Sequence, residues 1–512
     1  MQHISGISRN QMRISSLEDT IAHDNQVRFI DAFVMFIDLS KLGFSVQTIK
    51  REGRPSYNTT LFLKAYLYGY INGIRSSRKL ERESFRNIEM QWLLEDIRPN
   101  YHSISDFRKN NSLALKNLFK LYVVFLKDAD LIGCETIAID GTKSRAHNSR
   151  KANFNQKKID KHLEYIEAKT QEYLDALEEN DAKENAPKIK NIQQKIERLK
   201  QNKLRYDLLE EKLKASGEPQ ISTTDSDARA LLVQGQVVEI SFNVQAAVDA
   251  KHNLVVATHT INKNDRSALS AIALEAKENL GIETYTALVD KGYHNGKQIE
   301  ICKQGSITTI VAQPGQGKSN ENGTQPAYLV ARFQYNKSND TYTCPEGQTL
   351  QTTGRWHKKT TDKDSYNFKK YRTSKCRECP VKHLCTSRAA GREIDRSQYA
   401  DAVEENNKRY QENPQLYRKR QEINEHIFGT IKRQWGYNHT NLTGLDKVNG
   451  EHSLIMLVYN IKRSINILGV PELIAKLQKW NSPYKEKVLF LLKTSYLKLN
   501  TATVFYSEKL TA

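Results

Sequence analysis

Apolar and polar positions alternate in three different rhythms along the chain, and each rhythm predicts a different kind of element. Residues 59–97 and 102–126 carry apolar positions at three- and four-residue steps, the spacing of helices that bury one face. Ser103 or Ser105 is the expected N-cap of the second stretch. We therefore predict an all-helical domain over residues 1–130.

A longer, heptad-like rhythm occupies residues 155–216. Two stretches whose apolar positions step by four and three are separated by a polar turn that contains Pro187. This pattern predicts an antiparallel helical hairpin, which serves either protein–protein contact or reach along DNA. Because strand signals resume beyond it, we interpret the hairpin as an insertion.

Short apolar runs bounded by turn residues predict strands on both sides of the hairpin. The segment ETIAIDGTKSRAHNS is expected to form a strand that ends at Asp140, and ISFNVQAAVD and NLVVATHTIN are expected to pair as a β-hairpin. A helix over SALSAIALEAKENLG and strands in YTALVDKGYHN and SITTIVAQP follow. This order predicts an α/β domain in which a mixed sheet is flanked by helices.

The remaining chain divides by composition. Residues 313–415 lose the strand–helix rhythm and contain four of the six cysteines. Residues 416–472 return to helical spacing and end in an apolar helix, so we assign them to the α/β domain that begins with residues 131–312. We expect residues 473–512 to form a partly helical tail.

Composition restricts the class of protein and its partners. The chain has 512 residues, of which 38% are hydrophobic and 27% charged, as in a folded, water-soluble protein. Lys and Arg number 78 against 59 Asp and Glu, and this net charge of +19 favours a polyanionic partner over a merely solvated basic surface. No apolar run could span a bilayer or serve as a secretory signal. We therefore expect a cytoplasmic protein with no membrane partner and with reduced cysteines.

Three acidic residues are candidates for catalysis. Asp140 and Asp290 each follow a buried-looking strand, and Glu425 has no basic residue three or four positions away on its helix. Carboxylates from separate elements could hold two Mg²⁺ or Mn²⁺ ions about 4 Å apart, a pair that acts on phosphodiesters. The alternative is that each aspartate is a turn or capping residue, as we expect for Asp225, Asp227 and Asp249.

The motifs that contain these acids resemble those of DDE transposases of bacterial insertion sequences, and most closely the insertion sequence 1182 group. The matching stretches are IAIDGTKSRAHNS, FNVQAAVDAKHNLVVATHTINKNDRSAL, LVDKGYHN, the cysteine segment and EHIFGTIKRQWGY. The resemblance implies an RNase H-like catalytic domain in which Asp140, Asp290 and Glu425 hold two Mg²⁺ ions. It also implies a double-stranded DNA partner, binding to element ends, 3′-end cleavage and strand transfer. The N-terminal helices would then be a helix-turn-helix-like DNA-binding domain, although a plain packing module fits the same residues.

Related insertion-sequence transposases share a Tyr, Arg, Glu and Lys signature along the acidic helix. Lys432 stands seven positions after Glu425, as that signature requires, and should lie on the same helical face. Arg433 beside it is either a phosphate contact or an ordinary backbone-binding cation. Tyr417 and Arg420 are displaced from the signature, with Gln421 where the arginine is expected, so their phosphate-contact roles depart from the family pattern.

Four cysteines form a candidate Zn²⁺ site. Their spacing is Cys344-x31-Cys376-x2-Cys379-x5-Cys385, and a closely spaced pair flanked by further cysteines in a reducing compartment favours structural zinc. Four reduced thiols without a metal are the alternative.

Three functions remain open on the sequence. They are a Mg²⁺-dependent transposase that works as a dimer or higher oligomer, an RNase H-like nuclease that cuts DNA without joining it, and a non-catalytic protein that binds DNA and oligomerises.

Overall fold

The computed structural model describes residues 7–481 except 9, 13, 46–55, 148–149, 182–185, 234–236, 314–323 and 362–363. The chain divides into two compact units. The first comprises residues 1–264, 275–282 and 421–512, and the second comprises residues 265–274 and 283–420. Antiparallel strands, a parallel strand pair and helices occur together, which confirms the predicted α/β class at this general level.

The first unit begins with helices, as predicted. They are η1 (Glu18–Thr20), α1 (Gln26–Phe36), α2 (Thr59–Ile71), α3 (Ser77–Arg86), α4 (Ile88–Leu93), α5 (Tyr101–Asn110) and α6 (Ser112–Asp128). The predicted N-cap was wrong, because Asn100 begins α5 and its side chain accepts the Ser103 N–H at 2.9 Å. Asparagine is among the strongest N-cap residues, so both serines lie inside the helix.

Four strands of the first unit surround a long central strand. They are β1 (Thr136–Arg145), β4 (Arg229–Val233), β5 (Val237–Asp249) and β6 (Leu254–Ile261). β5 pairs antiparallel with β1 on one side and with β4 and β6 on the other, which confirms the β5–β6 hairpin. Asp140 does not end its strand as predicted. β1 continues for five residues beyond it because its partner β5 is long enough to keep pairing as far as Arg145.

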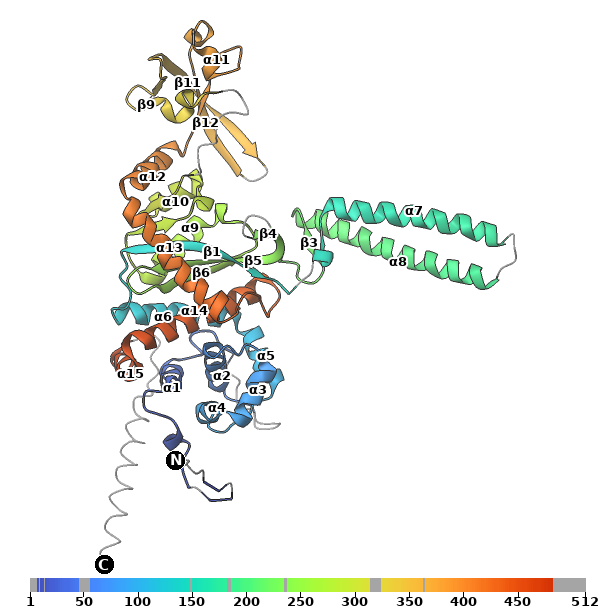
Figure 1. The fold of residues 1–512 in the computed structure, drawn as a ribbon, viewed down its shortest axis with the longest axis vertical. Helices are drawn as coiled ribbons and strands as arrows, with labels where there is room; N and C mark the ends of the chain where they lie inside the picture. The colour runs from blue at the N-terminus through green and yellow to red at the C-terminus, as the bar shows by residue number, and fades with distance from the viewer. Residues whose placement is uncertain are drawn as a thin grey trace, which may run out of the picture. The chain divides into compact units, whose positions relative to one another are not determined.

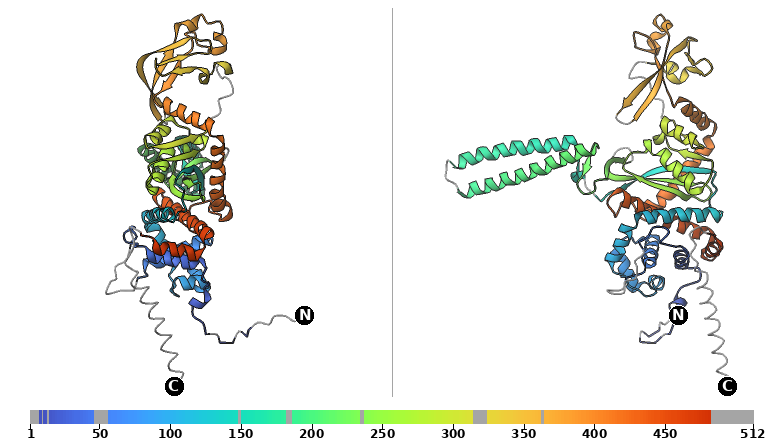
Figure 2. Two further views of the ribbon diagram at one scale, coloured as in Figure 1. Left: turned by 90° about the vertical axis from the view of Figure 1, so that its left-hand side faces the viewer. Right: turned by 180° about the vertical axis from the view of Figure 1, so that it is seen from behind.

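The predicted apolar helix near the C-terminus is the most buried element of the first unit. α14 (Leu445–Leu468) buries nearly every residue from Val448 to Ile461, and it lies alongside α6 in both orientations (Figures 1 and 2). The Asn460 amide, which is fully buried, pairs with the N–H and the carbonyl of Val255 on β6 at 2.9 and 2.7 Å. α15 (Val470–Lys479) follows, and the predicted tail beyond residue 481 lies outside the described residues.

A buried ion pair connects α14 to the N-terminal helices. Glu451 is fully buried, and its Oε1 lies 2.7 Å from Arg75 Nη2 and 3.8 Å from Arg108 Nη1. Its Oε2 accepts the N–H groups of Asn441 and Leu442 at 2.9 and 3.1 Å. These contacts compensate the charge that burial would otherwise make costly.

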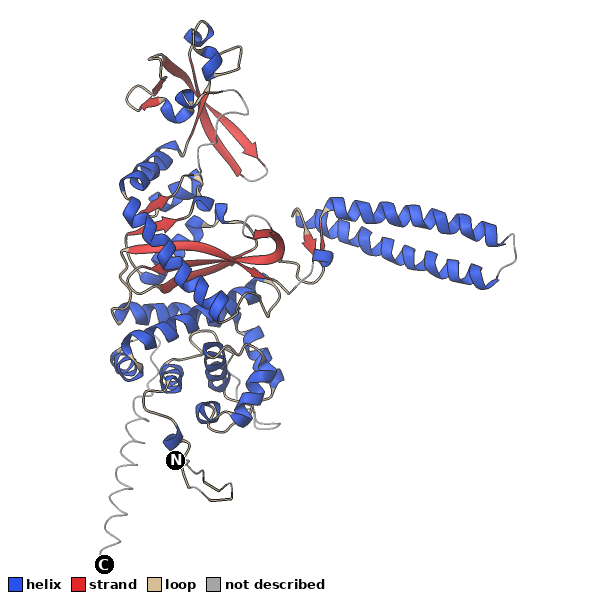
Figure 3. Ribbon diagram, in the orientation of Figure 1, coloured by secondary structure: helices blue, strands red, loops and turns tan. Residues whose placement is uncertain are grey.

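The predicted helical hairpin is confirmed. α7 (Gln156–Asp181) and α8 (Ala186–Ser216) run antiparallel as a pair of long helices (Figure 3). A two-residue ladder between β2 (Asn153–Phe154) and β3 (Ile221–Ser222) closes its base, next to η2 (Arg150–Ala152). Pro187 lies in the first turn of α8 rather than in the connecting turn, a position where its missing N–H costs no helical hydrogen bond.

The second unit contains the strand that precedes Asp290. β7 (Tyr285–Val289) pairs in parallel with β8 (Ile307–Val311), and both strands were predicted. The connection between them includes α10 (Gly296–Gln304), a short helix that was not predicted. The remaining elements here are η3 (Asp265–Ser267), η4 (Lys291–Tyr293) and α12 (Ala400–Glu412). Two helices cross the boundary between the units along the chain, α9 (Leu269–Leu280) and α13 (Pro414–Phe428).

The cysteine-rich segment of the second unit has its own antiparallel sheet, in the order β13-β12-β11-β10-β9. Its core is small, with five buried residues in one cluster: Phe333, Tyr342, Leu350, Tyr371 and Ile394. Its strands and short helices are η5 (Pro326–Tyr328), η6 (Val330–Arg332), β9 (Gln334–Asn336), β10 (Thr341–Thr343), β11 (Thr349–Thr361), β12 (Asp364–Arg372), η7 (Ser374–Arg377), α11 (Lys382–Cys385) and β13 (Ile394–Ser397).

Within the described part of the chain, none of the helices combines the length and apolar character that crossing a bilayer requires.

Candidate functional site

Asp140 lies in the middle of β1 and is half-buried. Its Oδ1 accepts the N–H of Gly141 at 2.8 Å, and its backbone is opposite Ala246 of β5. Because side chains alternate between the two faces of a strand, Asp140 and Thr142 share one face of the sheet. Thr142 therefore marks the face on which a partner of Asp140 must lie.

Lys432 reaches that face from a distant part of the first unit. It belongs to η8 (Gly429–Gln434), a π-helical segment that follows α13. Its Nζ donates to Thr142 Oγ1 and to the Lys143 carbonyl, both at 3.0 Å, and burial lowers its pKa. The segment after Glu425 is thus fastened to the face of β1 that carries Asp140.

The π-helix also corrects one prediction about Lys432. A regular α-helix would place it on the same face as Glu425, two turns further on, but α13 ends at Phe428 and the wider π turn changes the phase. Its role as a phosphate contact stays a prediction, and so does that of Arg433, which is exposed.

Glu425 is exposed on α13, while Ile423 and Ile427 on either side of it are buried. Its neighbours on the helix are not basic, as the sequence indicated. It does have a partner on its own helix, because the Gln421 side-chain amide donates to its Oε1 at 2.7 Å. This partner is neutral, so the carboxylate still has no cationic neighbour within one turn of its helix.

Asp290 lies in the second unit, directly after β7, as predicted. It is the N-cap of η4 and accepts the Gly292 N–H at 3.5 Å. Arg420 Nη2 lies 3.5 Å from Asp290 Oδ1, and the same guanidinium lies over the Tyr417 ring. Burial raises the pKa of Tyr417. The displaced signature residues therefore surround the predicted metal ligand, a contact that the sequence spacing did not indicate.

The acids that we set aside as capping residues have that role in the first unit. Asp225 accepts the Gly444 N–H at 3.2 Å and Asp227 accepts the Leu445 N–H at 2.8 Å, where α14 begins. Asp249 accepts the N–H groups of Gly133 and Cys134 at 3.0 and 2.9 Å.

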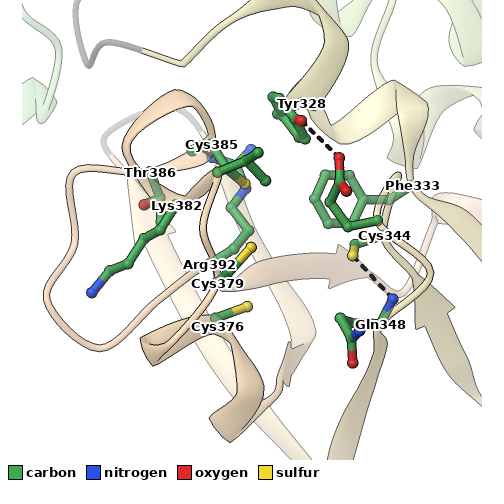
Figure 4. Close-up of a pocket in the computed structure, with 12 residues that line it drawn as sticks. Tyr328, Phe333, Cys344, Gln348, Cys376, Cys379, Lys382, Cys385, Thr386 and Arg392 are labelled. Atoms are coloured by element: carbon green, nitrogen blue, oxygen red, sulfur yellow. Dashed lines mark hydrogen bonds between the residues drawn. The ribbon is translucent and has the colours of Figure 1, made fainter.

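The predicted metal ligands have suitable donor atoms but are not assembled. Asp140 and Glu425 belong to the first unit and Asp290 to the second. Carboxylate oxygens are the donors that Mg²⁺ and Mn²⁺ prefer. Among the described residues, however, no group of three or more His, Cys, Asp or Glu side chains is arranged to hold a metal ion. The four cysteines nevertheless line one pocket of the second unit (Figure 4).

Thr142 and Gln421 are the contacts of the candidate site that the sequence analysis missed. Both had a signal. Thr142 stands two positions after Asp140 in a strand, and Gln421 stands four positions before Glu425 in a helix, and both spacings place side chains on one face.

Comparison with known proteins assigns two segments. Residues 343–465 match the family model described as "Transposase DDE domain", and residues 15–110 match the one described as "Transposase domain (DUF772)". No curated protein and no solved structure matches the chain. The first segment contains Glu425, Lys432 and the four cysteines, whereas Asp140 and Asp290 lie outside both. Two separate parts of the chain are thus similar to transposase domains, and both matches support a DDE transposase.

Proposed function

We propose that the chain is a DDE transposase that binds the terminal repeats of a mobile element, cuts DNA at its 3′ ends and joins those ends to a target. The observation that carries the proposal is the contact of Lys432 with Thr142, which holds the segment after Glu425 against the Asp140 face of β1. The two transposase matches support the same activity. The catalytic domain in this proposal is RNase H-like, and the N-terminal helices bind DNA.

Asp140, Asp290 and Glu425 provide the carboxylates for two Mg²⁺ or Mn²⁺ ions in the proposed site. Divalent ions bound there would activate the attacking oxygen and stabilise the leaving oxygen of a phosphodiester. Asp290 must join the other two acids, and it must exchange its contact with Arg420 for this purpose. Arg420 is then available to donate to a DNA phosphate, the kind of planar, two-point contact that a guanidinium makes well.

The remaining parts of the chain have roles that follow from charge and shape. The net charge of +19 favours binding to the phosphate backbone, with an affinity that falls steeply as salt increases. The α7–α8 hairpin is proposed to join two copies of the chain, because its helices expose large apolar residues such as Leu204 and Leu208, 70% and 51% exposed.

Amide substitutions test the catalytic assignment. Asp140→Asn, Asp290→Asn and Glu425→Gln keep the size of each side chain and remove its charge. We expect each to lower end cleavage and strand transfer by at least about a hundredfold, while the affinity for terminal-repeat DNA changes by less than about threefold. Glu422→Gln, an exposed glutamate on the same helix, is the matched control and should keep full activity.

The outcomes separate the proposal from its alternatives. Cleavage without joining of the cut end to target DNA identifies a nuclease rather than a transposase. DNA binding without cleavage in the unsubstituted chain, at any Mg²⁺ or Mn²⁺ concentration, identifies a non-catalytic DNA-binding protein. Full activity in Asp290→Asn removes that residue from the site.

A further inference from the structure

The four cysteines of the cysteine-rich segment come from separate pieces of chain and meet at one pocket (Figure 4). Cys344 lies in the turn between β10 and β11, Cys376 in η7, Cys379 just after it, and Cys385 at the end of α11. None of them forms a disulfide. The cavity measures about 30 Å³, which is room for a single ion or water molecule and too little for an organic ligand.

The turn that carries Cys344 is shaped around its sulfur. Gln348 N donates to Cys344 Sγ at 3.2 Å, and Cys344 N donates to the Gln348 carbonyl at 2.9 Å. Gly347 has a positive φ of 72° and donates from its N–H to the Cys344 carbonyl at 2.9 Å. An N–H group directed at sulfur stabilises the thiolate form, which is the form that binds metals.

The chain near Cys376 is equally constrained. Gly391 has a φ of 95°, and a Cβ added to it would lie 2.4 Å from the Cys376 Cβ. Only glycine permits so close an approach at this backbone conformation. Cys376 is therefore held against a returning loop rather than left on an open surface.

A cation accompanies the thiols. Arg392 lines the pocket and donates from Nη1 to the Cys385 carbonyl at 3.4 Å. Its Nε is buried and has no hydrogen-bond partner among the described residues. Four thiolates around a divalent ion carry a net charge of −2, and a guanidinium beside them offsets part of it.

The segment also lacks a core large enough to hold it together by itself. Its single cluster of five buried residues holds a five-stranded sheet, and Cys344 and Cys385 pack against that cluster. Domains with so little buried apolar surface are commonly stabilised by a metal or by disulfides. Disulfides are absent, so a metal is the remaining stabiliser of this kind.

We propose that Cys344, Cys376, Cys379 and Cys385 bind one structural Zn²⁺ that ties the β10–β11 turn to η7 and α11. The thiols are not yet arranged to hold an ion, so they must close on it as it binds. Each thiol releases its proton to solvent when its sulfur coordinates the ion, which makes the affinity increase with pH. The closed, four-sulfur site has no open position for substrate, and its role is to stabilise the fold.

The experiment measures metal in the full chain, purified without chelators. We expect about one zinc per chain, and a loss of at least tenfold in zinc content for Cys376→Ser and for Cys379→Ser. Cys134→Ser is the matched control, because Cys134 is a half-exposed thiol of the first unit and should leave the zinc content unchanged. Asp140→Asn should also keep its zinc, which separates this proposal from the proposed catalytic metals.

A second measurement covers the case in which a cysteine variant fails to fold. Metal-free full chain is titrated with Co²⁺, whose absorption reports tetrahedral thiolate coordination, and zinc should then displace the cobalt. Limited proteolysis should cut residues 324–397 faster in the metal-free chain than in the zinc-loaded chain. Fewer than about 0.1 zinc per chain after incubation with Zn²⁺, together with no cobalt–thiolate absorption, overturns the proposal. Full zinc content in folded Cys379→Ser overturns it as well.

Discussion

Lys432 and Thr142 are separated by 290 positions in the chain, yet the lysine ammonium donates to the threonine hydroxyl at 3.0 Å. A second bond to the Lys143 carbonyl, also 3.0 Å long, makes the lysine a bridge between η8 and β1. A lysine that the family signature places on a phosphate is, in the DNA-free chain, part of the protein's own framework.

Replacing this lysine separates the two roles. Lys432→Met removes both bonds and should destabilise the first unit by about 1–3 kcal/mol, since a charged donor is lost from two acceptors. Amide hydrogen exchange of residues 136–145 should then become faster. Arg433→Met, an exposed neighbour, should change stability by less than about 0.5 kcal/mol. If Lys432→Met instead leaves exchange unchanged and lowers the salt dependence of DNA binding by about one counterion, the phosphate role is the correct one.

The buried carboxylate of Glu451 gives a larger effect. Glu451→Gln leaves the Arg75 guanidinium buried without a full counter-charge, so we expect a loss of about 3–5 kcal/mol in unfolding free energy. Urea unfolding of the full chain measures it. The exposed pair of Glu167 with Lys203 is the control, and Glu167→Gln should cost less than about 1 kcal/mol. Similar losses in the two variants would contradict the proposed importance of the buried pair.

Acid should weaken the first unit through His452. Burial lowers the pKa of His452 to about 4, below its usual value of about 6.5. A histidine with a lowered folded pKa stays neutral in the folded chain while the unfolded chain takes up a proton. Its contribution is therefore complete above pH 6.5 and is lost as pH falls toward 4, by about 3 kcal/mol in all.

The measurement is unfolding free energy against pH, with variants at a buried and an exposed position. His452→Gln should flatten the slope between pH 6.5 and 4, whatever it does to stability at neutral pH. His23→Gln, at an exposed position, should keep the slope of the unsubstituted chain. An unchanged slope in His452→Gln would assign the acid sensitivity to other groups.

The helical hairpin can be removed at its base. Phe154 of β2 pairs with Ile221 of β3, so residues 155–220 can be replaced by an Asn-Gly turn that suits a two-residue hairpin. We expect the shortened chain to fold and to bind single DNA ends, but to fail to assemble paired ends. Analytical ultracentrifugation with and without terminal-repeat DNA measures the assembly. An unchanged assembly state would leave reach along DNA as the function of the hairpin.

The sequence predicted those elements whose pattern is local and strong. The heptad spacing of α7 and α8, the β5–β6 hairpin and the apolar stripe of α14 each reflect residues within one or two turns of each other. The length of β1 was wrong because it depends on pairing with β5, about a hundred residues away. The first N-cap was wrong because Asn100 competes with two serines that lie close to it in the chain.

The candidate site was predictable in its residue types but not in its contacts. The positions of Asp290 after β7 and of Glu425 on a helix follow from local patterns. The π turn at η8 redirects Lys432 toward β1, and no periodicity announces such a turn. The pairing of Arg420 with Asp290 joins residues 130 positions apart, and it depends on tertiary folding.

The deep burial of α14 has a consequence for how the chain is made. This helix packs against α6 and, through Asn460, completes the hydrogen bonding of β6, yet it is among the last segments to leave the ribosome. The first 260 residues must therefore wait, with their apolar faces uncovered, until the C-terminal part is synthesised. Any message truncated before codon 461 would yield a product prone to aggregation and degradation, so premature stop codons anywhere upstream should silence the gene completely.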